Sequence, residues 1–138
     1  MDSALQEVVQ DWLLKALSDL ETARLVAATP GMRTDTAIYH CQQVGEKALK
    51  GFLAAQNDDI EKTHDVRKLL QACAAFDAAF LQWMPDAIVL NPYATIYRYP
   101  GLSSQKQPSR IELDEALLAA QRLYDFVTLI LPPETRPR

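Results

Sequence analysis

Apolar residues recur at steps of three and four positions along most of the chain, which is the period of an α-helix. In residues 3–28 the repeating positions are Leu5, Val9, Trp12, Ala16, Leu20 and Ala23. Residues 34–56 carry a second stripe, made of Ala37, Cys41, Val44, Ala48 and Phe52. Residues 109–131 carry another, made of Leu113, Leu117, Ala120, Leu123, Tyr124, Val127 and Leu131. The pattern predicts three long helices, each with one apolar face.

Capping and helix-breaking residues divide the rest of the chain. Ser3 with Gln6 and Ser109 with Glu112 have the spacing of capping boxes, and Thr63 is typical of an N-cap. We expect further helices at residues 64–75, 77–84 and 86–97, the last with Pro92 as a kink. No segment alternates with the two-residue period of a half-buried strand. The sequence therefore predicts an all-α, up-down bundle of four to five helices in residues 1–131, followed by a C-terminal tail, 132–138.

Length, net charge and cysteine content indicate which classes of protein the chain can belong to. The chain has 138 residues, enough for one domain with a core of its own, and a formal net charge of −4. Such a charge argues against loose electrostatic binding to nucleic acid. No apolar run approaches the roughly 20 residues that cross a bilayer, and the first residues do not resemble a signal peptide. Two cysteines in apolar stripes form no disulfide framework. We expect a cytoplasmic protein that does not contact a membrane.

The expected topology gathers positive charge at one end. In an up-down bundle, the end of the second helix, the starts of the third and fifth and the end of the fourth share one pole. That pole would hold Lys50, Lys62, His64, Arg67, Lys68, Arg98, Lys106 and Arg110. A phosphate there would also meet the free amides at the start of the third helix. The alternative is that these residues are solvated helix ends.

Two residues of this pole have the chemistry of a site. His64 can carry a proton or bind an anion near neutral pH, although Thr63-His64-Asp65 equally well begins a helix. Arg98 lies between Tyr97 and Tyr99, where a guanidinium can hold a phosphate while a ring stacks on a base. It can equally cap the end of a helix. The candidate ligand-binding residues are Lys47, Lys50, His64, Arg67, Tyr97, Arg98 and Tyr99, and His64 and Arg98 are the catalytic candidates.

Three segments resemble the HEPN domain family. AIYHCQQVGEKALKGFLAAQ, residues 37–56, is similar to the second helix of that family, and EKTHDVRKLL, residues 61–70, is similar to the start of its third. YATIYRYP, residues 93–100, resembles the end of its fourth helix. The resemblance covers nearly the whole chain and implies a bundle of four or five helices that forms a homodimer.

The resemblance also implies a range of functions. Many HEPN proteins act with a minimal nucleotidyltransferase as a toxin–antitoxin pair, several are metal-independent RNases, and others are thought to bind nucleotides. The RNases carry Arg, four to six residues and then His near the last long helix. Here no histidine follows Arg98 or Arg110; Arg33 and His40 have the spacing, but we place them towards the opposite pole and treat the match as coincidence.

The function predicted from the sequence is that of a HEPN domain that binds nucleotide, or that partners a minimal nucleotidyltransferase, without itself being an enzyme. The first alternative is a metal-independent endoribonuclease that uses Arg98 with His64. The second is a structural dimer that scaffolds another chain. We expect no cofactor and no metal site, because no group of Asp, Glu, His or Cys has metal-ligand spacing.

Overall fold

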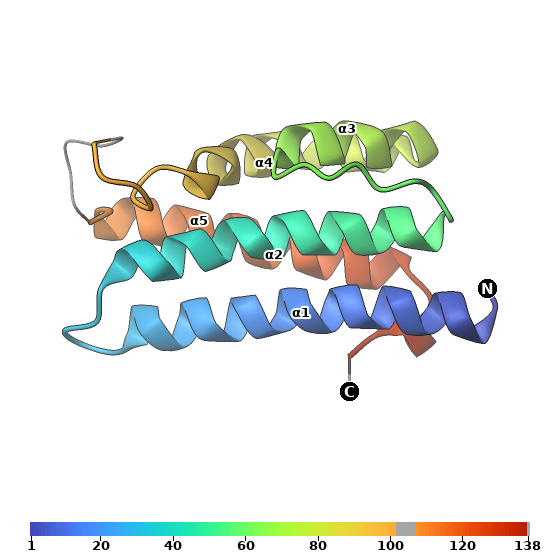
Figure 1. Ribbon diagram of the computed structural model, residues 1–138, viewed down its shortest axis with the longest axis horizontal. Coiled ribbons are helices and arrows are strands. Elements are labelled where there is room, and N and C mark those ends of the chain that lie inside the picture. Colours follow the sequence, from blue (N-terminus) through green and yellow to red (C-terminus); the bar gives the residue numbers. More distant parts are fainter. Residues whose placement is uncertain (102–106, 138) are drawn as a thin grey trace.

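Helices form nearly all of the computed structural model, which describes residues 1–101 and 107–137 (Figure 1). The described residues form five α-helices: α1 (Ser3–Ala28), α2 (Thr34–Ala55), α3 (Val66–Phe76), α4 (Met84–Leu90) and α5 (Arg110–Ile130). Short 3₁₀ helices are η1 (Ala78–Trp83), η2 (Asn91–Ala94) and η3 (Pro133–Thr135). No strand occurs in this part of the chain. The prediction of an all-α bundle is confirmed.

The α2 helix lies at the centre and is buried along most of its length. Its neighbours are α1 on one side, α5 on another, and α3 with α4 on a third (Figure 1). Two glycines allow the close approach. A Cβ atom on Gly51 would lie 3.2 Å from Cβ of Trp12 on α1, and one on Gly45 would lie 2.8 Å from a methyl group of Leu90 on α4. Small residues on two faces of α2 therefore let both neighbouring helices pack against it.

The connection between α2 and α3 is not a short turn that leads directly into the next helix. Instead, residues 57–65 run back alongside α2 before α3 begins (Figure 1). The Gln42 amide donates to the His64 carbonyl at 2.9 Å, and the Cys73 thiol donates to the Leu49 carbonyl at 3.5 Å. The α3 helix consequently runs parallel to α2 and begins beside its middle. The prediction that the start of the third helix shares a pole with the end of the second is wrong.

Several helix boundaries differ from the expected ones for local reasons. Asp2, rather than Ser3, caps α1, and Asp65, rather than Thr63, caps α3 through a bond from the Lys68 amide. The fourth helix stops at Leu90 and continues only as η2. Pro92 explains this, because proline lacks the amide hydrogen and crowds the preceding turn. The Ser109–Glu112 capping box at the start of α5 is confirmed.

The C-terminal tail packs against the bundle. Gln6 donates to the Glu134 carbonyl and Gln10 to the Arg136 carbonyl, while the Thr135 side chain is buried. These bonds hold η3 against the first turns of α1. Among residues 1–101 and 107–137, no helix combines the length and apolar character needed to cross a membrane.

Candidate functional site

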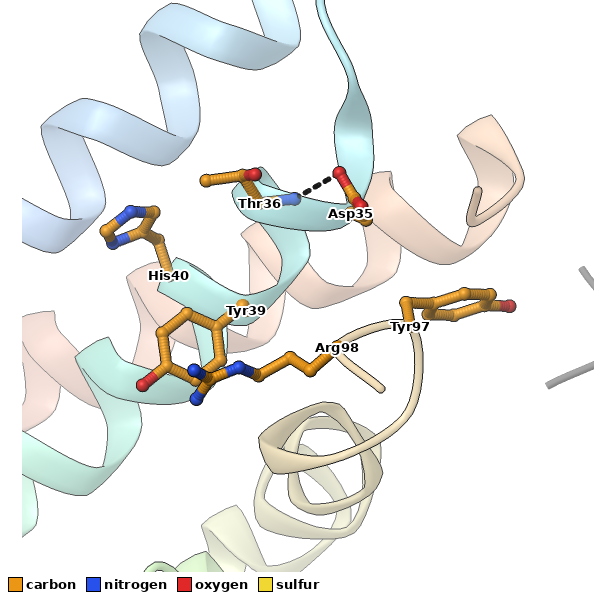
Figure 2. Close-up of a pocket in the computed structure, with 6 residues that line it drawn as sticks. All are labelled: Asp35, Thr36, Tyr39, His40, Tyr97 and Arg98. Atoms are coloured by element: carbon orange, nitrogen blue, oxygen red, sulfur yellow. Dashed lines mark hydrogen bonds between the residues drawn. The ribbon is translucent and has the colours of Figure 1, made fainter. Parts of the chain in front are cut away.

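One open pocket of about 320 Å³ lies where the start of α2 meets the segment that follows η2 (Figure 2). It is lined by Asp35, Thr36, Tyr39, His40, Tyr97 and Arg98. Two of these residues, Tyr97 and Arg98, are candidates from the sequence. The other four come from the first two turns of α2. The end of the fourth helical region thus faces the start of α2 and not its end, so the expected grouping of Arg98 with Lys50 is wrong.

Backbone conformation fixes where Arg98 projects. Tyr97 has a φ angle of +71°, a left-handed conformation that is costly for a bulky residue and is maintained only by its surroundings. Its hydroxyl donates to the Glu112 carboxylate on α5 at 2.9 Å. The Ser109 amide and the Tyr97 hydroxyl hold the pKa of Glu112 below its usual value, so the acceptor stays charged. An anchored Tyr97 therefore directs the next residue, Arg98, towards α2.

The Arg98 guanidinium stacks on the ring of Tyr39. Figure 2 shows the guanidinium beside this ring. Its central carbon lies 4.0 Å from the Tyr39 ring centroid and 5.5 Å from that of Tyr99. Within residues 1–101 and 107–137, no carboxylate or carbonyl accepts a hydrogen bond from it. Stacking orients the plane of the guanidinium and leaves its edge donors available. Arg98 thus combines a fixed position with unused hydrogen-bond donors.

A buried carboxylate orients the histidine of the pocket. Asp19 of α1 accepts a bond from Nδ1 of His40 at 2.6 Å and one from Nζ of Lys47 at 2.7 Å. Burial raises the pKa of Asp19, but the bonds from His40 and Lys47 outweigh burial and leave the pKa below its usual value. An ionised Asp19 keeps the hydrogen of His40 on Nδ1, so Nε2 can accept a proton or, when protonated, donate to an anion.

A second polar cluster lies further along α2, away from the pocket. Nδ1 of His64 bonds to the Glu46 carboxylate at 2.6 Å, and Lys50 contacts the same carboxylate at 3.2 Å. Gln43 donates to Glu46 and to Gln42 at 2.7 Å each. The side chain of Glu46 is 3% exposed, whereas that of His64 is 79% exposed. We call these five residues the Glu46 cluster; it fastens residues 57–65 to α2.

The remaining candidates are dispersed. Lys47 lies against α1 with Asp19, Tyr99 is exposed beside Arg98, and Arg67 is exposed on α3. Lys106 lies outside the described residues. At the start of α3, the Val66 amide donates to Asn91 and the Lys68 amide to Asp65. These two amides are therefore already occupied, contrary to the expectation that a phosphate would find free donors there.

Sequence reasoning missed five residues of the site, and the sequence holds a signal for two of them. His40 is the histidine of the Arg33–His40 spacing that we set aside as coincidence. Its placement towards the pole opposite Arg98 is wrong, because both line one pocket. Asp19 interrupts the buried face of α1, three residues after Ala16 and four before Ala23, which marks it as a buried acid. Asp35, Thr36 and Tyr39 carry no comparable signal in the sequence.

Comparison with known proteins agrees with this architecture. The HEPN domain family model matches residues 9–130, which is most of the chain. The chain belongs to the HEPN family. Its fold is similar to that of TT1696 from Thermus thermophilus, with a TM-score of 0.80 and 28% identity over 91% of this chain and 99% of that one. It is also similar to ST0689, described as an archaeal HEPN homologue, with a TM-score of 0.68 and 29% identity over 87% and 94% of the two chains.

No curated protein sequence matches this HEPN domain significantly. The segments that resemble the family have distinct structural roles in it. Gln42, Gln43, Glu46 and Lys50 of α2 build the Glu46 cluster with His64. Tyr97 and Arg98 form one wall of the pocket. No group of three or more metal-binding side chains occurs in the described part of the HEPN domain.

Proposed function

We propose that this HEPN domain binds a phosphate-bearing ligand, a nucleotide or an RNA, in the pocket of Arg98. The observation that carries the proposal is the Arg98 guanidinium, which is held on the Tyr39 ring with its donors unused in the described structure. A planar guanidinium matches two phosphate oxygens at once. His40, oriented by Asp19, supplies a second donor when it is protonated.

The aromatic rings around Arg98 suit a base as well as a phosphate. Tyr99 is exposed, and the Arg98 guanidinium lies 5.5 Å from its ring centroid. A base stacked on an aromatic ring gains roughly 1–3 kcal/mol. Stacking does not depend strongly on which base is present, so the site selects for nucleotides in general rather than for one base.

A minimal nucleotidyltransferase is the partner that we propose, in a two-component, toxin–antitoxin-like system. The proposal rests on membership of the HEPN family and on a site suited to nucleotides. We expect a gene for such an enzyme beside the gene for this chain, and a stable complex when the two are expressed together. A neighbouring gene of unrelated class, together with separate elution of the two proteins, would count against this partner.

Replacing Arg98 by alanine should weaken nucleotide binding by about ten- to a hundredfold. A hydrogen bond to a charged group contributes about 1.5–3 kcal/mol, and each 1.4 kcal/mol is a factor of ten. Calorimetry with ATP, GTP and a short oligonucleotide measures the effect. Arg98→Lys should lose most of the affinity as well. Lysine keeps the charge but lacks the planar guanidinium, whose N–H groups bind two phosphate oxygens at once.

Arg67→Ala is the matched control for that experiment, since it removes an exposed arginine outside the pocket. It should bind nucleotide like the parent. If Arg98→Ala stays folded and binds as tightly as the parent, or if no ligand binds the parent below millimolar concentration, the proposed function is wrong.

A metal-independent endoribonuclease remains the second candidate, because the structure brings an aspartate-oriented histidine, His40, into the pocket of Arg98. We nevertheless expect no cleavage of unstructured RNA above background. The sequence lacks the family's spacing of Arg and His near the last helix, and His64 bonds to Glu46 outside this pocket. Cleavage that persists with a chelator and disappears in both Arg98→Ala and His40→Ala would establish the nuclease instead.

We also propose that the protein is a homodimer that associates through α5. Ile111, Leu118 and Leu129 are 73%, 52% and 71% exposed, and their spacings of seven and eleven residues place them on one side of the helix. Sedimentation at micromolar concentration should give a dimer for the parent and a monomer for Leu118→Glu. A parent that sediments as a monomer of 15.5 kDa would contradict this.

A further inference from the structure

Asp35 and Arg98 line the same pocket but do not pair with each other. None of the ion pairs within residues 1–101 and 107–137 joins them. One oxygen of Asp35 accepts a hydrogen bond from the backbone amide of Thr36 at 2.8 Å (Figure 2). This bond holds the carboxylate against the first turn of α2. The other oxygen has no hydrogen-bonding partner in the described structure. The pocket therefore offers separate donor and acceptor groups that do not satisfy one another.

The spacing of these two groups restricts the ligand. Asp35 and Tyr39 are one turn apart on α2, which separates their Cβ atoms by about 5–6 Å. The Tyr39 ring points away from Asp35 and the Arg98 guanidinium lies on this ring, so the two charged groups lie further apart than these Cβ atoms (Figure 2). A ligand that satisfies both groups must carry an acceptor for Arg98 and, in a separate part of the molecule, a hydrogen donor for Asp35.

We propose that the pocket binds a ribonucleoside 5′-phosphate, with its phosphate on Arg98 and its ribose 2′,3′-diol on Asp35. This inference rests on the proposed function and adds recognition of the sugar to it. A carboxylate accepts hydrogen bonds from ribose hydroxyls, and the 2′-hydroxyl distinguishes ribose from deoxyribose. A free carboxylate at this position would repel the 3′-phosphate of an internal RNA residue, so the site selects a mononucleotide or a 3′-terminal residue.

The size and charge of the pocket agree with a single nucleotide. A volume of about 320 Å³ lies at the small end of the range for ligand sites. The lining carries Arg98 for the phosphate and Asp35 for the sugar hydroxyls, with His40 in the same pocket. Thr36 also lines the pocket, and its backbone amide bonds to the Asp35 carboxylate.

The test compares AMP with 2′-deoxy-AMP and 3′-deoxy-AMP by calorimetry, on the parent and on Asp35→Asn. We expect the parent to bind AMP about tenfold more tightly than either deoxy analogue, since each loses a hydrogen bond to a charged acceptor. Asp35→Asn should bind AMP and 2′-deoxy-AMP within about twofold of each other. Asp11→Asn, which changes an exposed acid on α1 outside the pocket, is the matched control and should keep the preference of the parent.

The outcomes separate this inference from the proposed function. If the parent binds AMP and both deoxy analogues equally, and Arg98→Ala still weakens binding at least tenfold, sugar recognition is wrong while phosphate binding stands. If inorganic phosphate binds as tightly as AMP, the sugar contributes nothing and the inference is again overturned. If neither nucleotide nor phosphate binds, both proposals fail. Thermal unfolding of Asp35→Asn confirms that any change in binding is not a loss of fold.

Discussion

Replacing Glu46 by alanine should lower the free energy of unfolding by about 3–5 kcal/mol, which is the typical cost of breaking a buried ion pair by removing one partner. The carboxylate is almost completely buried and contacts Gln43, Lys50 and His64. Without it, the Lys50 ammonium, whose side chain is only 12% exposed, loses its counter-charge inside the bundle. Urea unfolding followed by circular dichroism measures the change.

His64→Ala is the control within the same cluster. It removes one bond to Glu46, but the imidazole is mostly exposed, so the expected cost is at most about 1 kcal/mol. Glu46→Gln should fall between the two, because the amide keeps a hydrogen-bonding oxygen but loses the charge that Lys50 needs. If Glu46→Ala and His64→Ala lower the free energy of unfolding equally, the buried charge of Glu46 does not stabilise the fold beyond its one bond to His64.

The Glu46 cluster changes the interpretation of the most specific sequence motif. Lys50 and His64 are candidates for ligand binding from the sequence, yet in the structure both hydrogen-bond to Glu46. Through the Gln42 amide and the His64 ring, the cluster holds an extended segment of chain against a helix. A segment without helical hydrogen bonds needs such partners for its backbone. We infer that the motif around Glu46 mainly stabilises the fold.

Helix positions could be predicted from the sequence, but their directions could not. Apolar periodicity identifies the buried face of α1, α2 and α5 because each buries one stripe of side chains. It contains no information on whether residues 57–65 turn at once or run back along α2. That path depends on the hydrogen bonds between α2 and His64, which join residues far apart in sequence. The incorrect pole for Lys50 and Arg98 follows from this single connection.

Only the part of the candidate site that has a local sequence signal could be predicted from the sequence. Arg98 stands between two tyrosines and before Pro100, a pattern that suits phosphate and base recognition, and the structure places it at a pocket. Its neighbours Tyr39 and His40 come from a helix about sixty residues earlier. Their proximity depends on the left-handed backbone at Tyr97 and its bond to Glu112, which a helical pattern through residues 86–97 does not suggest.

Replacing Asp19 by alanine should cost about 2–3 kcal/mol of stability at neutral pH, because both His40 and Lys47 lose a charged hydrogen-bond partner. The effect should depend on pH. Burial works against ionisation of Asp19, but its bonds to His40 and Lys47 prevail, and its pKa in the folded protein lies below the usual value. Such a group stabilises the fold above its unfolded pKa, about 3.9, and loses this contribution as pH falls through the folded pKa.

The difference in unfolding free energy between parent and Asp19→Ala should therefore be full at pH 7 and shrink steadily below about pH 4. Urea unfolding at several pH values measures it, with Asp11→Ala as the control for an exposed acid on the same helix. Asp19→Ala should also weaken nucleotide binding, because His40 loses the carboxylate that fixes its orientation. A difference that stays constant from pH 7 down to about pH 3 would show that the ionised carboxylate of Asp19 does not stabilise this end of the bundle.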